Sequence, residues 1–262
     1  MKIVFDIPSL IPYVNWPYFY YAWQVKEEQE KIRLRTEAEV FLMKIENRYQ
    51  AYALFELFAA NADGDDIVLD EHRIPLLRQQ QGKPPYLCLS DFLRPITSGI
   101  KDRVGVFATS VDLGLETDFD SDPYQKMMAQ LLADRLAEAA AECMHEQVRK
   151  KYWGYAKDEQ LSIPDILIEK FQGIRPAIGY PSLPDTSLNF VLNDLLDLRQ
   201  IGIRLTESGA MKPHASVSGL MLAHPKARYF NLGKIGEDQL RDYARRRGLP
   251  IEVVRKFLAS NL

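Results

Sequence analysis

The longest periodic stretch of the chain extends from about residue 123 to 152, where apolar side chains recur every three or four positions. The apolar series runs from Met127 to Val148 and falls on one face of a helix. The same spacing predicts a helix over 27–44. Ser162, placed as an N-cap with a proline two residues later, predicts a shorter helix after the long one.

Short apolar stretches between turn-forming residues predict strands. We expect them at 49–58, 67–70, 86–92, 104–111, 203–208, 216–224 and 227–235. The segment His224–Lys226 predicts a hairpin between the last two strands, and Gly202 and Gly248 are placed to end helices. Because strands adjacent in sequence are joined by short links, we predict an antiparallel sheet in one α+β domain.

Composition narrows the classes of function. The 262 residues carry 33 basic and 36 acidic side chains, a net charge of −3. This balance provides neither the basic patch typical of nucleic-acid binding nor a basic helix that would bind a membrane surface. No apolar run approaches the roughly 18–20 residues of a membrane-spanning helix, and the amino terminus does not have the pattern of a signal peptide. Cys88 and Cys143 have no metal-ligand spacing, so we expect a reduced, cytoplasmic protein without a metal centre.

The loop at 173–185 is the most informative segment for chemistry. Three prolines and two glycines in thirteen residues fix its backbone while leaving room for a ligand. Arg175 on this stiff loop is suited to hold a carboxylate or phosphate through paired hydrogen bonds. The alternative is a structural crossover whose arginine caps a helix end.

The long helix carries a polar stripe of Asp134, Glu138, Glu142 and His145. The last two residues have the Glu-x-x-His spacing of carboxylate metal sites, but such sites need a second pair, which the sequence lacks. We therefore interpret the stripe as a solvated face. The cluster of cations at 245–247 is interpreted as a helix terminus, with a docking patch for an acidic partner as the alternative.

Several long motifs occur together and in a fixed order: NWPYFYYAW, LADRLAEA, HEQVRKKYWGYA, GIRPAIGYP, LTESGAM, ASVSG and DYARRRG. As a set they resemble the reactivation domain of cobalamin-dependent methionine synthase, from about residue 10 to the end of the chain. The resemblance implies one curved, C-shaped α+β domain over 1–262, with a twisted, mainly antiparallel sheet flanked by helices. It also implies binding of S-adenosylmethionine, whose methyl group restores the oxidised cobalamin of the synthase while a flavodoxin-like donor supplies one electron.

The resemblance also implies roles for individual residues. Arg175 would hold the carboxylate of S-adenosylmethionine, and Tyr180 would stand near the axis of methyl transfer. The remaining ligand contacts would be Asn15, Ala177, Gly179, Tyr229 and Phe230. Asp134 and Glu138 would face the cobalamin-binding module, where Asp134 would engage the histidine that leaves the cobalt.

Two of these positions depart from the family pattern. Asn15 stands where the family has an aspartate that accepts from the ligand's ammonium group, and Phe230 stands where it has a tyrosine. The chain is also too short to contain the other modules of the synthase. We therefore expect a stand-alone subunit that acts in trans on a cobalamin-carrying partner and is not a complete enzyme alone, although an excised fragment is the alternative. A binding module that gates a corrinoid protein without donating a methyl group is the competing function.

Overall fold

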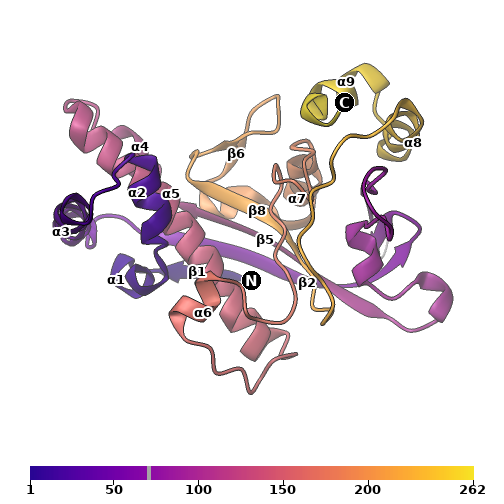
Figure 1. Ribbon diagram of the computed structural model, residues 1–262, viewed down its shortest axis with the longest axis horizontal. Helices are drawn as coiled ribbons and strands as arrows, with labels where there is room; N and C mark the ends of the chain where they lie inside the picture. Colours follow the sequence, from indigo (N-terminus) through magenta and orange to yellow (C-terminus); the bar gives the residue numbers. More distant parts are fainter. Residues whose placement is uncertain (70–71) are drawn as a thin grey trace.

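The computed structural model describes residues 1–69 and 72–262 (Figure 1). Its centre is an antiparallel sheet of six strands in the order β4-β3-β2-β5-β8, with β1 also paired to β2. The strands are β1 (Lys2–Phe5), β2 (Ala51–Asp63), β3 (Asp66–Leu69), β4 (His72–Pro75), β5 (Asp102–Val111) and β8 (Ser216–Met221). A separate two-stranded ribbon joins β6 (Arg204–Leu205) to β7 (Met211–Lys212).

Helices flank this sheet. They are α1 (Ile7–Leu10), α2 (Trp16–Ala22), α3 (Glu28–Ile45), α4 (Gly114–Thr117), α5 (Pro123–Gln147), α6 (Ile163–Leu167), α7 (Leu188–Leu196), α8 (Glu237–Arg247) and α9 (Ile251–Phe257). In Figure 1, α1 to α3 lie at one end of the sheet and α8 and α9 at the other, which gives the molecule a curved outline. The α+β class and the curved antiparallel sheet are therefore confirmed. Among the described residues, no helix combines the length and apolar character that crossing a bilayer requires.

The central strand β5 separates two hydrophobic cores. Phe107 faces the core beneath α5, whereas Val106 and Ala108 face the core beneath α7. Both faces of β5 are covered, and every residue from 104 to 111 is buried, without the alternation of a half-exposed strand. The hydroxyl of Thr109 donates to the carbonyl of Ala137 at 2.9 Å, which ties the strand to the middle of α5.

The long helix, the strand at 104–111 and the helix capped by Ser162 are confirmed. Two predicted strands are wrong. The segment 86–92 ends in a 3-10 turn over Leu89–Phe92, because the carboxylate of Asp91 accepts from the backbone N–H of Cys88 at 2.9 Å. The segment 227–235 pairs with no strand in the part of the chain that the structure describes, so the predicted hairpin at His224–Lys226 is a simple turn.

Candidate functional site

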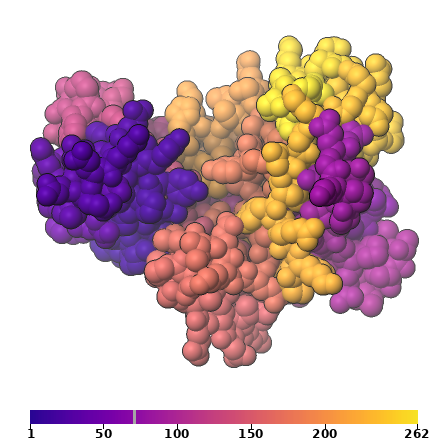
Figure 2. Space-filling model, in the orientation of Figure 1, coloured from indigo at the N-terminus to yellow at the C-terminus, as the bar shows by residue number. Residues whose placement is uncertain are grey.

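A pocket of about 800 Å³ opens on the side of the sheet where α5 lies. Its walls come from five parts of the chain: the α2 region, α5, the segment 167–182, Val217 on β8 and the segment 229–231. Figure 2 shows the surface hollowed where the indigo, coral and gold segments approach one another. Seven of the nine residues expected at a site line this pocket: Asn15, Glu138, Arg175, Ala177, Tyr180, Tyr229 and Phe230.

The loop 173–185 lies directly on β8. The N–H of Ile178 donates to the carbonyl of Ser218 at 2.9 Å, and the N–H of Leu220 donates to the carbonyl of Pro176 at 3.0 Å. Gly219 allows this approach, because a Cβ at that position would lie 2.2 Å from the Pro176 oxygen. The strand therefore positions the backbone on either side of Ala177.

Arg175 is held at both its backbone and its side chain. Its guanidinium donates to the carboxylate of Glu142 at 2.6 Å, and its N–H donates to the hydroxyl of Tyr229 at 3.0 Å. Both side chains of the ion pair are largely buried. The prediction that Glu142 lies on a solvated face is wrong, because the crossing loop brings Arg175 over that part of α5.

The Arg175–Glu142 pair is incompletely satisfied. Nε of Arg175 and Oε2 of Glu142 are buried and have no hydrogen-bond partner among the described residues. Native interiors leave few polar atoms in this state, and they concentrate where a ligand or water completes the network. The pair is thus a charged, partly unsatisfied wall of the pocket.

Aromatic side chains form a further part of the lining. Burial raises the pKa of Tyr229 to about 12, so its hydroxyl stays protonated at neutral pH. Tyr180 remains half exposed at the mouth of the pocket, and burial together with the Glu138 carboxylate raises its pKa. Phe230 contributes an apolar surface without a hydroxyl.

The other two expected ligand contacts, Asn15 and Gly179, stabilise the local backbone. Asn15 is the N-cap of α2, and its Oδ1 accepts from the N–H of Tyr18 at 3.5 Å. Gly179 adopts a φ of 89° and donates its N–H to the carbonyl of Leu183 at 2.8 Å, forming the turn that carries Tyr180. Gly179 is not part of the pocket wall.

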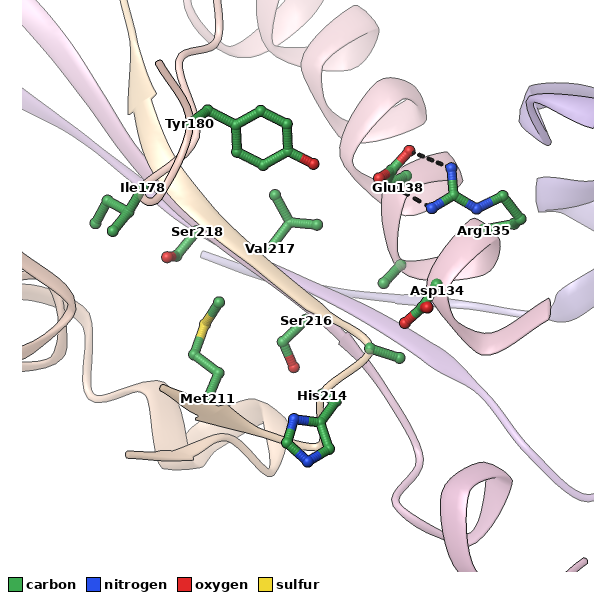
Figure 3. A pocket seen from close by; sticks show the side chains of 12 residues that line it. Asp134, Arg135, Glu138, Ile178, Tyr180, Met211, His214, Ser216, Val217 and Ser218 are labelled. Atoms are coloured by element: carbon green, nitrogen blue, oxygen red, sulfur yellow. Dashed lines mark hydrogen bonds and ion pairs between the residues drawn. The ribbon is translucent and has the colours of Figure 1, made fainter. Parts of the chain in front are cut away.

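A smaller pocket of about 240 Å³ adjoins the first and shares Tyr180 and Glu138 with it. Figure 3 shows Asp134 and Glu138 on α5 at the right of this pocket and His214 below it. Glu138 accepts two hydrogen bonds from Arg135, at 2.9 and 3.2 Å. Asp134 has no such partner among the described residues, and burial raises its pKa. Asp134 therefore adds a carboxylate without an ion-pair partner among the described residues to the lining of the smaller pocket.

His145 lies beneath the larger pocket and does not reach it. The imidazole is fully buried against the ring of Phe171, and burial together with nearby Arg149 lowers its pKa well below the usual value. It stays neutral at physiological pH. No group of three or more His, Cys, Asp or Glu side chains able to hold a metal occurs in the described part of the chain.

Two of the three arginines at 245–247 bind carboxylates that lie outside α8. Arg247 donates to the buried carboxylate of Asp185 at 3.0 Å, and the hydroxyl of Tyr243 donates to the same oxygen at 2.7 Å. Arg246 pairs with Asp66 on β3. Thus α8 fixes the end of the loop 173–185, a role that the sequence interpretation missed.

The sequence interpretation also missed Glu169, which lines the larger pocket directly after α6. No motif marks this residue, since it follows a helix of only five residues. The aromatic positions Tyr13 and Tyr18 are further lining residues, and they belong to the aromatic block near the start of the chain.

Two comparisons with known proteins agree with this geometry. Residues 6–248 match the family model described as vitamin B12 dependent methionine synthase, activation domain. The fold is similar to a crystal structure of the MetH reactivation domain bound to AdoHcy, with a TM-score of 0.95 and 37% sequence identity. That match covers 100% of this chain and 90% of the other.

Proposed function

The chain belongs to the family of activation domains of vitamin B12-dependent methionine synthase, and from that membership we propose that it binds S-adenosylmethionine in the larger pocket. We further propose that it supports reductive methylation of cobalamin carried by a partner module, with a flavodoxin-like protein as electron donor. The corrinoid would be presented to the pocket by a separate module, and we propose that the chain acts on that module in trans.

The observation that carries the proposal is the partly unsatisfied Arg175–Glu142 pair in a pocket of about 800 Å³. A pocket of this volume is within the range of small-molecule sites. The related reactivation domain is described as bound to AdoHcy, the demethylated form of S-adenosylmethionine. Arg175 supplies the cation that the ligand's carboxylate requires, and Ala177 supplies adjacent backbone.

S-Adenosylmethionine supplies an electrophilic methyl group on a sulfonium. The contribution of this chain is positioning, since such a transfer needs alignment and little acid–base catalysis. Tyr180 lies where the two pockets meet, and its raised pKa keeps its hydroxyl neutral. We propose that Tyr180 borders the path of the methyl group and that Asp134 and Glu138 face the cobalamin-binding module.

A second candidate is a module that docks on a corrinoid protein without donating a methyl group. It is favoured by Asn15, whose Oδ1 is already used as an N-cap, and by Phe230, which has no hydroxyl. Binding of the cobalamin-binding module that is independent of S-adenosylmethionine would support this candidate over the first.

Isothermal titration calorimetry with S-adenosylmethionine tests the main proposal. We expect saturable binding to the wild-type chain and loss of binding in Arg175→Ala, with its folding checked by circular dichroism. Arg199→Ala is the matched control, because Arg199 is exposed and pairs locally with Asp197 at 2.7 Å. Absence of wild-type binding at millimolar ligand would refute the proposal. Reactivation by this chain of a methionine synthase that lacks its own activation domain tests action in trans.

A further inference from the structure

One wall of the larger pocket has no regular secondary structure. Residues 227–236, which we call the strap, lead into α8 and form neither helix nor strand (Figure 1). Three consecutive strap residues line the pocket: Tyr229, Phe230 and Asn231. A segment outside a helix or sheet has no ladder of backbone hydrogen bonds, so its position depends on groups from elsewhere in the chain.

Burial fixes only the second half of the strap. Leu232 and Ile235 are 1% and 6% exposed and pack in the core formed with α8 and α9. The N–H of Leu232 also donates to the carbonyl of Pro181 at 2.9 Å. Tyr229 and Asn231, which line the pocket, are both exposed. The pocket-lining half of the strap therefore has less burial to fix its position.

A glutamine from a distant part of the chain binds this exposed half. Nε2 of Gln79 donates to the carbonyl of Asn231 at 2.7 Å. The amide oxygen of Gln79 accepts from the N–H of Leu87 at 3.0 Å. The backbone N–H of Gln79 donates to the carbonyl of Leu87 at 2.9 Å. Because both polar atoms of its side-chain amide are bonded, Gln79 directs its donor at the strap in one orientation.

The backbone that carries Gln79 is itself fixed. The side chain of Gln239 on α8 accepts from the N–H of Arg78 at 2.7 Å and donates to the carbonyl of Arg78 at 2.8 Å. The side chain of Gln80 accepts from the N–H of Gly236, at the end of the strap, at 2.6 Å. Gln79 therefore binds the strap from a backbone that is hydrogen-bonded on both sides of it.

We propose that Gln79 is a positioning residue of the larger pocket, acting through the carbonyl of Asn231. Its hydrogen bond sets the place of Tyr229 and Phe230, the two residues that precede Asn231 in the wall. The inference rests on the proposed function and concerns how its site is built, because Asn231 lines the pocket and Gln79 does not. Tyr229 also accepts the N–H of Arg175 at 3.0 Å, so a displaced strap would release the backbone at Arg175 as well.

Two variants of the full chain, Gln79→Glu and Gln79→Met, test the assignment. Both replacements have nearly the length of glutamine, and neither donates to the Asn231 carbonyl at neutral pH. We expect each to weaken binding of S-adenosylmethionine by about three- to tenfold in calorimetry, the effect of losing one hydrogen bond. In reactivation assays the apparent KM for S-adenosylmethionine should rise while the rate at saturation stays unchanged, because bound ligand keeps the wall in place.

Hydrogen exchange of the ligand-free proteins, followed by mass spectrometry, measures the strap directly. Peptides that cover 229–236 should exchange faster in both variants, whereas peptides from α5 should keep wild-type rates. Gln200→Glu is the matched control. Nε2 of Gln200 donates to the carbonyl of Leu196, also at 2.7 Å, and this residue lies outside both pocket linings. The control should change neither the affinity nor the exchange of the strap.

Wild-type affinity in folded Gln79→Glu and Gln79→Met would overturn the assignment, as would an equal loss of affinity in Gln200→Glu. Reduced affinity with wild-type exchange over 229–236 would also overturn it, since Gln79 would then act without moving the strap. A wild-type chain that binds no S-adenosylmethionine would refute the proposed function, and the exchange rates would still decide whether Gln79 fixes the strap.

Discussion

Gly219 on β8 is the position where a single added methyl group should damage both the fold and the pocket. A Cβ there would lie 2.2 Å from the Pro176 carbonyl oxygen and 2.9 Å from the Cα of Ala177. Cβ atoms essentially never lie within 3.0 Å of another heavy atom, and both obstacles are backbone. In Gly219→Ala the loop 173–185 therefore has to move away from the strand.

The cost of that movement can be worked from the contacts. The loop is tied to β8 by two hydrogen bonds, Ile178 to Ser218 at 2.9 Å and Leu220 to Pro176 at 3.0 Å. Weakening these bonds and overpacking the interface should together lower the free energy of unfolding by about 2–5 kcal/mol. Because the same loop carries Arg175, affinity for S-adenosylmethionine should fall as well.

Urea denaturation measures the stability change, and calorimetry measures the affinity of the folded variant. Gly236→Ala is the matched control: its φ is −85°, and an added Cβ would meet only the movable Asp238 side chain and the end of Gln80. A loss below about 0.5 kcal/mol in Gly219→Ala, with unchanged affinity, would contradict the close approach of loop and strand.

Two further predictions concern buried groups. Tyr243→Phe removes the hydroxyl that donates to Asp185 and should lower the free energy of unfolding by about 1.5–3 kcal/mol, as measured by urea titration. A change within experimental error would show that Arg247 alone satisfies the carboxylate. The pKa of His145 is depressed in the folded state, so the unfolded chain binds the proton more tightly. Stability should therefore fall as the pH decreases below about 6.5, by up to about 1.4 kcal/mol per pH unit, and His145→Gln should remove that slope. Urea denaturation at several pH values measures this slope. An equal slope in the wild-type chain and in His145→Gln would contradict the assignment.

The elements that sequence periodicity predicted well are those governed by local patterns. The apolar spacing of α5 and the cap at Ser162 are properties of neighbouring residues, and both are observed. The segment 227–235 has a strand-like composition, yet no strand among residues 1–69 and 72–262 pairs with it. Its Leu232 instead donates to the carbonyl of Pro181 in the loop 173–185. That partner is distant in sequence and leaves no local signal.

The same distinction applies to the pocket. The stiff loop around Arg175 was recognisable from its prolines and glycines, and the arginine predicted a role in binding an anionic group. The partner of Arg175 was not recognisable from the sequence. Glu142 lies 33 residues away, on a helix face that would be solvated without the crossing loop. The place of Glu169 in the pocket wall depends on its left-handed backbone conformation, which no rule of sequence spacing predicts.

The pocket combines walls from near both ends of the chain, from Tyr13 to Asn231. During synthesis the first wall emerges from the ribosome long before the last, and domains acquire their tertiary contacts as later segments arrive. Binding competence should therefore appear only when nearly the entire chain has been made. A ligand that binds only the complete site would also favour the folded over the unfolded chain, by about 2.7 kcal/mol at a hundred times its Kd.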